Sequence, residues 1–562
     1  MSTPPPCPRV APAGDAAVLV TLGERIDPAL NARVHALAEA LRPLPWVDDA
    51  IPGYASLLLE YDPLAVSYAE VEAAVHAALD ALPAAPRREG RLRQVPTVYG
   101  GEYGPDLEAV AARVGLAPEE VVRLHAGTVQ RVYFLGFAPG HPYMGDLPPV
   151  LALPRLPTPR TAVPAGAVAI AGGQTVIYPF SFPGGWHILG RTPLRLFDPE
   201  REPPAYFQPG DRVQFVPIPP TAWSDYVEPA APSARPPVTD AALTVEAGGL
   251  LTLVQDGGRV GYGHLGVPRS GPMDWAALRA ANLLVGNAPG AAGLEINLVG
   301  PTLRFHRDAL LAVTGGDLRP TLDGEPLPLW AAWYARAGQV LRFGPRRAGL
   351  RAYLALAGGI AVPPVLGSRA TYVRAGLGGL AGRALQAGDR LALAPPSPDP
   401  RCQLGCYLPP EHRPPYSAAP EVRVLLGPHA DRFSDETIDT FLSATYTVSP
   451  ASDRMGYRLA GPRLARREPA DLVSGGMPLG GVQVPGDGQP IVLLSDHQPT
   501  GGYPLLATVI QADLPLVAQL APGDTVRFRA VSLAEARAAY RARLAATAAL
   551  ARRALLLVPA EE

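Results

Sequence analysis

The sequence has 562 residues and a formal net charge of -2, and the 49 residues counted as lysine or arginine are all arginine. Without lysine, the chain cannot carry a GxxxxGK[ST] phosphate loop, a protein-kinase core, a Schiff-base lysine or a covalently attached biotin. The small net charge gives no support for nucleic-acid binding.

Cysteine content and hydropathy bear on the location of the protein. Three cysteines do not make a disulfide framework, which favours a reducing compartment. The first residues, MSTPPPCPRVAPAG, lack the basic and apolar regions of a secretory signal, and no uncharged apolar stretch of about 18 residues follows. We therefore expect a cytoplasmic protein without a membrane partner.

Residues 15–85 are expected to form a small α/β domain of the ferredoxin-like type. Asp27-Pro28 predicts the N-cap and first-turn proline of one helix. Ser67-x-x-Glu70 is a capping box that opens a second helix. The predicted elements are strands at 16–22, 46–51 and 56–61 and helices at 27–41 and 67–82.

From residue 92 onward, short alternating strands separated by Gly and Pro turns predict β-barrels. A Gly turn followed by a period-2 strand recurs four times, as PGDRVQF (209–215), AGQVLRF (337–343), AGDRLAL (387–393) and PGDTVRF (522–528). The expected fold class is therefore mainly β with α/β additions, in several related barrels. The expected segments are a barrel at 92–222, a Pro-rich linker at 223–240, a barrel at 241–397, a Pro-rich connection at 398–420, a barrel at 421–531 and a C-terminal helix at 532–556.

Helices are expected at four places among these strands. Two short ones are predicted at 105–114 and 117–124. Asp274 is predicted to cap a helix that ends at Leu284, and the capping box Ser532-x-x-Glu535 opens the last helix.

The first candidate site lies in a region rich in Gly-Gly turns, which include Gly172-Gly173 and Gly184-Gly185. Paired glycines let backbone N–H groups approach an anion, an arginine offers a planar fork, and a glutamine can bind an amide or lactam edge. The alternative is that the glycines only turn the strands. The candidate binding residues are Arg160, Gln174, Thr175 and Arg191.

The second candidate site lies in the segment Gln255-Asp256-Gly257-Gly258-Arg259. Asp256 and Arg259 are candidates for binding substrate or ATP, and a turn-stabilising pair is the equal alternative. Asp274 has a sufficient role as a helix cap, so it is expected to be structural.

The third candidate site combines acid–base and binding side chains near further Gly-Gly turns. His497 beside Asp496 suggests a dyad, but adjacent strand residues usually point to opposite faces. The candidate catalytic residues are Asp453, Arg454 and Asp496, and the candidate binding residues are Gln483, Gln498 and Thr500.

No metal site is expected on this chain. Cys402-x-x-x-Cys406 with His412 lies in a Pro-rich connection and lacks a fourth ligand at the spacing that zinc requires.

The motifs of these clusters resemble two protein families. FLGFAPGHPYMGDLP, VPAGAVAIAGGQT and PGGWHILGRTP resemble the B subunit of bacterial three-subunit 5-oxoprolinase, the allophanate-hydrolase subunit 1 family. VQDGGRVGYGHLGVPRSGPMD, ANLLVGN and SDRMGYRL with SDHQPTGGYP resemble the C subunit, the allophanate-hydrolase subunit 2 family. The resemblance covers roughly residues 15–530, so the chain is similar to a B–C fusion. The carboxyltransferase part of urea carboxylase is similar in the same way.

The resemblance implies cyclophilin-like β-barrels and ATP-dependent opening of 5-oxo-L-proline to L-glutamate. It also implies a separate A subunit of the LamB/YcsF type, without which the chain is expected to be inactive, and Mg with the ATP. In the implied chemistry the lactam oxygen is phosphorylated and water opens the ring. Since lysine is absent, phosphate contacts would fall to backbone N–H groups and to Arg160, Arg191, Arg259 and Arg454.

The sequence departs from the family pattern at two positions. His141 stands where the family often has an aromatic residue. Leu505 follows the Gly-Gly-Tyr-Pro motif where a lysine is common, which puts in doubt a phosphate contact by that lysine.

Two other functions are left open by the resemblance. One is a carboxyltransferase acting on urea or a related amide, with a biotin carrier supplied by another chain. The other is a non-catalytic regulator of a histidine kinase. The sequence leaves open which barrel binds ATP and whether the chain forms a homo-oligomer.

Overall fold

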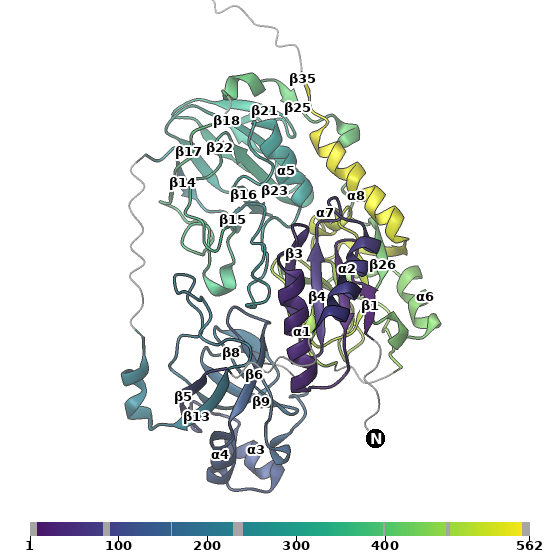
Figure 1. Cartoon of the computed structure of the whole chain (residues 1–562). Helices are drawn as coiled ribbons and strands as arrows, with labels where there is room; N and C mark the ends of the chain where they lie inside the picture. Colours follow the sequence, from purple (N-terminus) through teal and green to yellow (C-terminus); the bar gives the residue numbers. More distant parts are fainter. Residues whose placement is uncertain are drawn as a thin grey trace, which may run out of the picture.

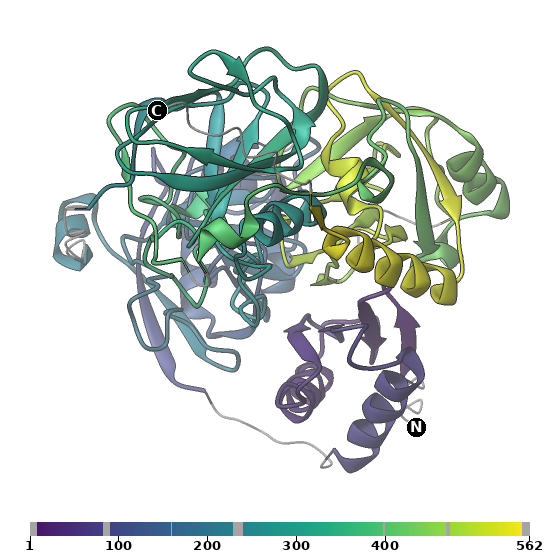
Figure 2. The same ribbon diagram turned by 90° about the horizontal axis from the view of Figure 1, so that it is seen from above.

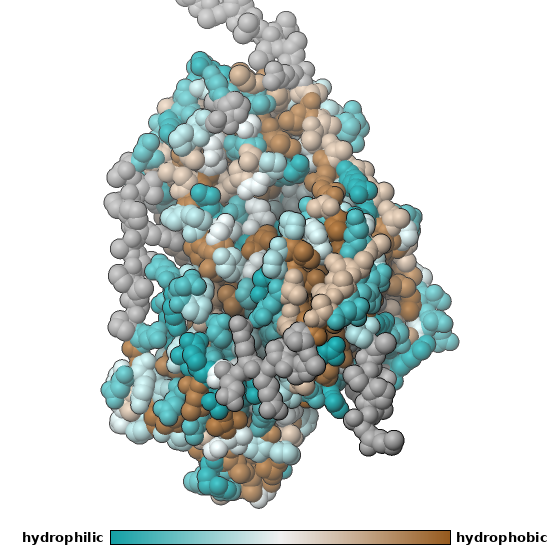
Figure 3. All heavy atoms as spheres, in the orientation of Figure 1, coloured by the Kyte–Doolittle hydropathy of each residue, from teal (hydrophilic) through white to brown (hydrophobic). Residues whose placement is uncertain are grey.

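The computed structural model describes residues 8–82, 90–158, 160–228, 240–396, 399–467 and 472–552. The fold is mainly β, with two closed barrels, two open sheets and a small N-terminal α/β domain (Figure 1). The face of the molecule seen in Figure 3 carries a mixture of hydrophilic and hydrophobic residues. Within the described ranges, none of the helices combines the length and the apolar character needed to cross a membrane.

The N-terminal domain confirms the predicted caps. Asp27 accepts hydrogen bonds from the backbone N–H groups of Ala29 and Leu30, and Ser67 and Glu70 form the complete capping box. The four strands pair in the order β1-β2-β4-β3, so that β1 takes the edge that a ferredoxin-like fold fills with its last strand. The elements are β1 (Arg9–Pro12), β2 (Ala17–Thr21), α1 (Pro28–Leu41), β3 (Val47–Pro52), β4 (Ser56–Tyr61) and α2 (Tyr68–Ala81).

Both faces of this N-terminal sheet are covered. Leu57, Leu59 and Tyr61 belong to the core with α1 and α2, whereas Leu58 belongs to a second buried cluster on the opposite face. A Cβ on Gly476 would lie 2.3 Å from the Leu58 Cβ, so the last barrel reaches this face. Figures 1 and 2 accordingly show the domain beside the last barrel, although the first barrel follows it in sequence.

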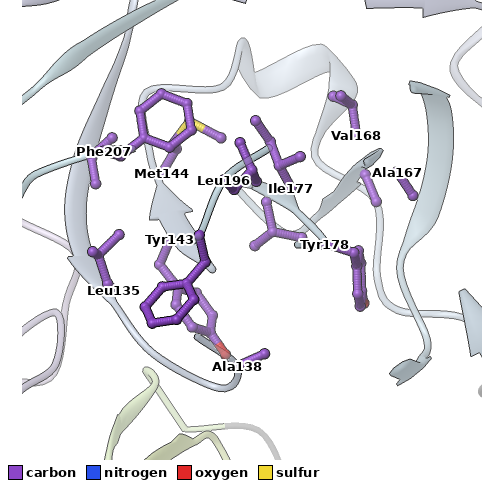
Figure 4. Packing of buried hydrophobic residues seen from close by; sticks show 14 of the residues in the cluster. Leu135, Ala138, Tyr143, Met144, Ala167, Val168, Ile177, Tyr178, Leu196 and Phe207 are labelled. Atoms are coloured by element: carbon purple, nitrogen blue, oxygen red, sulfur yellow. The ribbon is translucent and has the colours of Figure 1, made fainter. Parts of the chain in front are cut away.

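The first closed barrel follows the N-terminal domain in sequence. Its core includes aromatic residues such as Tyr143 and Tyr178, packed among aliphatic side chains (Figure 4). The helices α3 (Leu107–Val114) and α4 (Pro118–Gly127) precede its second strand, near their predicted positions. The strands are β5 (Leu92–Tyr99), β6 (Gln130–Leu135), β7 (Pro142–Met144), β9 (Ala167–Ala171), β10 (Gln174–Ile177), β12 (His187–Arg191) and β13 (Arg212–Pro217).

The second closed barrel repeats the topology of the first. When the seven strands of each barrel are numbered in chain order, both barrels close in the order 1-6-4-5-3-2-7, and the first and last strands are parallel. This identity confirms the prediction of related barrels. The strands are β26 (Glu421–Leu426), β27 (Tyr446–Val448), β28 (Gly456–Ala460), β30 (Gly481–Gln483), β31 (Ile491–Leu493), β33 (Leu505–Val509) and β34 (Thr525–Ala530), and the helices are α6 (Asp435–Ser443) and α7 (Leu514–Ala518).

Residues 241–397 differ from the closed barrel that we expected. They form a six-stranded sheet, β20-β19-β22-β17-β14-β24, and a five-stranded sheet, β15-β16-β23-β18-β21, that share one core. A Gly turn followed by a period-2 strand suits any antiparallel sheet, so it could not indicate closure. The first sheet contains β14 (Leu243–Ala247), β17 (Thr302–Phe305), β19 (Thr321–Leu322), β20 (Glu325–Pro326), β22 (Val340–Arg342) and β24 (Arg390–Leu391). The second contains β15 (Leu251–Gln255), β16 (Gly293–Asn297), β18 (Ala309–Asp317), β21 (Ala332–Ala335) and β23 (Ala348–Leu356), and α5 (Trp275–Leu284) begins at Asp274 as predicted.

The C-terminal helix α8 (Leu533–Ala548) ends earlier than the predicted residue 556. After it, β35 (Ala551–Arg552) pairs with β25 (Cys406–Tyr407), and this pairing turns the chain out of the helix. Arg537 of α8 donates to the carbonyl oxygens of Pro63 and Val66, both at 2.6 Å, and so holds the N-terminal domain. Of the predicted linker at 223–240, residues 229–239 lie outside the described residues, as do residues 553–556, and the short 3-10 helix Pro220–Tyr226 occupies the start of the linker.

The two closed barrels meet without room for an added side chain at Gly136. A Cβ built there would lie 2.1 Å from Thr500 Oγ1. We therefore expect Gly136→Ala to destabilise the fold by about 1–3 kcal/mol, as overpacking of a tight contact does. Gly127→Ala is the matched control, because a Cβ at this helical glycine meets nothing within 4 Å and alanine favours the helix. Thermal unfolding midpoints would contradict this expectation if the two variants proved equally stable.

Candidate active site at the domain junction

A cavity of about 510 Å³ lies where the N-terminal sheet, the 256–273 loop, the last barrel and α8 meet. Its walls carry both acidic and basic side chains, and it is the size of a small-molecule site. Residues far apart in sequence, such as Glu60, Arg269 and Ser495, line it together. The domain arrangement therefore creates this cavity.

The acidic wall comes from the N-terminal domain. Asp49 and Glu60 are cross-strand partners on β3 and β4, and Asp15 also lines the cavity, where it accepts a hydrogen bond from the Gln511 N–H. Asp49 accepts hydrogen bonds from the N–H groups of Gly263 at 2.6 Å and Ala50 at 2.8 Å. Burial nevertheless raises the pKa of Asp15 and that of Asp49 to about 6. These carboxyl groups therefore change charge at a higher pH than ordinary aspartates.

The basic wall comes from the 256–273 loop. Arg269 forms an ion pair of 3.1 Å with Asp48, and both side chains are partly exposed. Arg259 is 2% exposed and donates to the carbonyl oxygens of Val365 and Ala370, each at 3.0 Å. Its Nη1 has no hydrogen-bond partner among the described residues, and burial lowers its pKa.

Asp256 lines the cavity, but both of its carboxylate oxygens already accept hydrogen bonds from neighbouring loop residues. Its oxygens accept hydrogen bonds from Gly258 N–H, from the Ser368 hydroxyl at 2.6 Å and from Arg369 N–H. No direct hydrogen bond or ion pair between Asp256 and Arg259 appears in the described structure. The geometry thus favours loop stabilisation for Asp256 over a pair with Arg259.

A buried ionic network lies beside the cavity. Arg454 is 7% exposed, forms two hydrogen bonds with Asp496, of 2.9 and 3.2 Å, and also donates to Glu295. Glu295 further accepts a hydrogen bond of 2.7 Å from Tyr353 and lies 3.9 Å from Arg351. Burial acts to raise the pKa of Glu295, but Arg454 and Arg351 outweigh it and hold this pKa below its usual range. This network joins the five-stranded sheet to the last barrel.

Asp453, the neighbour of Arg454, has a different environment. It is about half exposed, forms an ion pair of 2.7 Å with Arg374, and accepts hydrogen bonds from the backbone N–H groups of Met455 and Gly456. It does not line the cavity. The structure therefore separates the three predicted catalytic residues, because Arg454 and Asp496 are paired and Asp453 stands apart.

The remaining predicted residues of the last barrel lie outside the cavity. The Gln498 amide donates to Gln483 Oε1 at 3.4 Å, and Gln483 donates to Met477 Sδ. Thr500 is fully buried near the Tyr143 phenol. Thr500 thus lies at the contact between the two barrels, Gln483 and Gln498 bond within the last barrel, and none of the three lines the cavity.

The predicted residues of the first barrel also lie away from the cavity. Arg160 forms an ion pair of 2.6 Å with Asp106, and Arg191 donates to the Ala165 carbonyl oxygen. The Thr175 hydroxyl lies 3.4 Å from His125, and Gln174 Oε1 has no hydrogen-bond partner among the described residues.

His497 and His141 are buried and engaged in packing. The ring nitrogens of His497 face the carbonyl oxygens of Leu494 and Met477, so the ring does not pair with Asp496. His141 packs against Tyr143 and Tyr178, and burial lowers its pKa to about 3. Leu505 is fully buried in β33, where its side chain supplies packing.

Seven charged residues of the cavity were missed in the sequence: Asp15, Asp48, Asp49, Glu60, Asp62, Arg269 and Arg279. The available signal was a set of carboxylates inside or beside strands whose neighbours are hydrophobic, at Asp48-Asp49 and Glu60. Such carboxylates are ordinary on a sheet face that is open to solvent. They indicate a site only once it is known that the last barrel covers this face, and the sequence does not show that. Within the described residues, no cluster of at least three His, Cys, Asp or Glu side chains could hold a metal ion.

The sequence matches known protein families over both halves. Residues 8–207 match "Carboxyltransferase domain, subdomain C and D", and residues 265–530 match "Carboxyltransferase domain, subdomain A and B". The chain is 41% identical to the 5-oxoprolinase C subunit of Escherichia coli K12 over 52% of its own length and 93% of that protein. It is also 41% identical to the 5-oxoprolinase B subunit of Bacillus subtilis 168, over 36% of its own length and 90% of that protein.

Two further proteins are similar to this chain, one over nearly its whole length and one over about half of it. The crystal structure of TTHA0988 superposes with a TM-score of 0.80 at 40% identity, and covers 91% of this chain and 99% of that one. Urea amidolyase of Saccharomyces cerevisiae is 37% identical over 53% of this chain, but only 17% of that protein is covered.

The buried network predicts unequal effects of substitutions at two adjacent residues. Arg454→Met leaves the Asp496 and Glu295 carboxylates buried without their cation, so we expect a loss of about 3–5 kcal/mol of unfolding free energy. Asp453→Asn removes an exposed ion pair while keeping the turn acceptor, so its expected cost is about 0–1 kcal/mol. Chemical denaturation of both variants checks this, and equal losses would contradict the role of the network.

Proposed function

The chain belongs to the carboxyltransferase-domain family and joins regions similar to the B and C subunits of 5-oxoprolinase, and from this premise we propose that it is the fused B–C component of an ATP-dependent 5-oxoprolinase. In this proposal it opens 5-oxo-L-proline to L-glutamate together with a separate A subunit of the LamB/YcsF type. The main support is the similarity of its two halves to proteins that carry the same enzyme name.

The observation that carries the proposal is the shared construction of the junction cavity. Asp49 and Glu60 come from the region similar to the B subunit, whereas Arg269 and Ser495 come from the region similar to the C subunit. Neither half alone encloses the space. A single chain that holds both halves in register keeps this cavity formed.

The charges on the cavity walls suit a small ligand with an anionic end and an amide end. The carboxylate of 5-oxoproline would lie toward Arg269, since a guanidinium can donate two hydrogen bonds to a carboxylate. The lactam group would lie toward Asp49 and Glu60, whose protonated forms donate and whose ionised forms accept hydrogen bonds. Binding therefore orients the ring between the two walls.

ATP would supply the phosphoryl group that activates the lactam oxygen. On this chain, Arg160 and Arg454 already pair with carboxylates, whereas Arg259 keeps one guanidinium nitrogen without a partner in the described structure. Arg259 and the N–H groups of the glycine-rich 256–273 loop are thus the groups that fit a phosphate best. In this proposal Mg enters with the nucleotide, and any lysine that the reaction needs is supplied by the separate A subunit.

A second candidate function is a carboxyltransferase that acts on urea or a related amide. The match to urea amidolyase supports it. Since the chain has no lysine, a biotin carrier would be another protein. An amide lacking a carboxylate would make no use of Arg269, so substrate preference separates the two functions.

The direct test is reconstitution. We expect the chain co-purified with its cognate A subunit to form glutamate when both 5-oxoproline and ATP are present, and to release ADP in proportion. Each protein assayed alone is the control. Glutamate formation no greater than that of the A subunit alone would refute the proposal, and biotin-dependent carboxylation of urea would replace it by the second candidate.

Arg269 provides a finer prediction with a matched control. Replacing it by glutamine removes charge-assisted hydrogen bonds worth about 1.5–3 kcal/mol, so we expect KM for 5-oxoproline to rise about 10- to 100-fold with a smaller change in kcat. Arg304→Gln is the control, because the Arg304–Glu246 ion pair has nearly the same exposure but lies outside the cavity. Equal KM values in the two variants would remove Arg269 from the substrate site.

A further inference from the structure

Glu60 stands at a position on the N-terminal sheet where strand geometry favours an apolar residue. Side chains alternate along β4, so Glu60 shares a face with Leu58, opposite to Leu57, Leu59 and Tyr61. Leu58 is fully buried on that face, beneath the last barrel. A carboxylate on a docked face is costly unless it has a partner or a function.

The structure shows no hydrogen-bond partner and no ion-pair partner for the Glu60 carboxylate within the described ranges. The side chain lines the junction cavity, where a bound molecule could reach it. Four buried groups on residues of the same cavity also have no hydrogen-bond partner among the described residues: Tyr61 Oη, Arg259 Nη1, Ser270 Oγ and Thr508 Oγ1. Since buried polar groups are normally satisfied, this set points to a polar ligand that completes them.

The charges around Glu60 come from every wall of the cavity. Burial, together with the neighbouring Asp49 and Asp48 carboxylates and against the opposing charge of Arg269, raises the pKa of Glu60 to about 7. This places proton exchange of the Glu60 carboxyl group close to neutral pH, the range that suits a general acid or base. The other titratable and charged groups in or beside the cavity are Asp15, Tyr61, Asp62, Asp256, Arg259, His264, Arg279, His497 and Tyr540.

We propose that Glu60 is the acid–base residue of the junction cavity and transfers a proton between the attacking water and the amide nitrogen of the ligand. The assignment rests on the proposed lactam-opening function. The water oxygen bonds to the amide carbon and its proton passes to the Glu60 carboxylate. The C–N bond then breaks, its electron pair stays on nitrogen, and the Glu60 carboxyl group returns the proton to that nitrogen. Because the lactam oxygen carries the phosphoryl group from ATP, this step leaves an acyl phosphate, which a second water hydrolyses to the carboxylate and inorganic phosphate. Glu60 ends each cycle as it began.

A purely structural role would be an ion pair with Arg269 that holds the N-terminal domain, and it predicts the opposite stability effect. A carboxyl group whose pKa is raised on folding destabilises the fold as pH rises from about 4.5 through 7. Glu60→Gln removes this loss, so the variant should unfold at a higher temperature than the wild type at pH 8 and at the same temperature at pH 4.5. An ion-pair role would lower the unfolding temperature of Glu60→Gln at pH 8.

The kinetic test uses the chain together with its A subunit. For Glu60→Gln we expect kcat to fall about 100- to 10,000-fold with little change in KM, and the rise of kcat/KM with pH near 7 to disappear. Glu60→Asp should retain part of the activity and shift that rise. Glu108→Gln is the control, because Glu108 is exposed on α3 and lies outside the cavity. Wild-type kcat and pH profile in Glu60→Gln would overturn the proposal.

A titration that does not depend on activity separates failure of this proposal from failure of the proposed function. Infrared difference spectra of the wild-type chain should contain a protonated-carboxyl band that disappears with a midpoint near pH 7 and is absent from Glu60→Gln. If reconstitution yields no glutamate, the proposed function fails, and Glu60 is then judged by this band. A Glu60 that is already ionised at pH 5 refutes the assignment in either case.

Discussion

The arrangement of this protein depends on the docking of the N-terminal sheet onto the last barrel. The outer face of that sheet carries Leu58, which packs where Gly475 and Gly476 remove side chains from β29 (Gly475–Gly476). Gly53 lies equally close, because a Cβ on it would meet the Gly475 backbone. Hydrophobic burial on this face therefore stabilises the contact between two segments more than 400 residues apart, and the same contact encloses the cavity.

The buried charged groups are of two kinds, those with ion-pair partners and those without. Arg454 is saturated by Asp496 and Glu295, and such a network fixes how the five-stranded sheet meets the last barrel. Glu60 and Arg259 Nη1, in contrast, lack partners within the part of the chain that the structure describes. Buried polar atoms without partners also occur away from the cavity, as at Gln130, Gln174 and Asn297. The cavity differs in bringing such groups together with the Glu60 carboxylate.

Local signals predicted local structure well. The caps at Asp27, Ser67 and Asp274 lie where the sequence places them, because each depends on neighbouring residues only. Residues 241–397, where we expected a barrel, form two separate sheets, since a turn-and-strand motif does not determine which strands pair across a sheet. The cavity was missed for the same reason: Asp49 and Glu60 resemble ordinary residues of a half-exposed sheet until a distant barrel covers it. Arg454 and Asp496 were selected for their chemistry, and the structure shows that they pair with one another.

In the proposed function, the junction cavity, built from both halves of one chain, holds the reacting lactam. A crystal structure of the chain with its A subunit, 5-oxoproline and a non-hydrolysable ATP analogue would test this directly. We expect 5-oxoproline in the cavity, with its carboxylate at Arg269 and its ring nitrogen within hydrogen-bond distance of Glu60. A lactam bound between the two closed barrels, near Tyr143 and Thr500, or wholly within the A subunit, would contradict it.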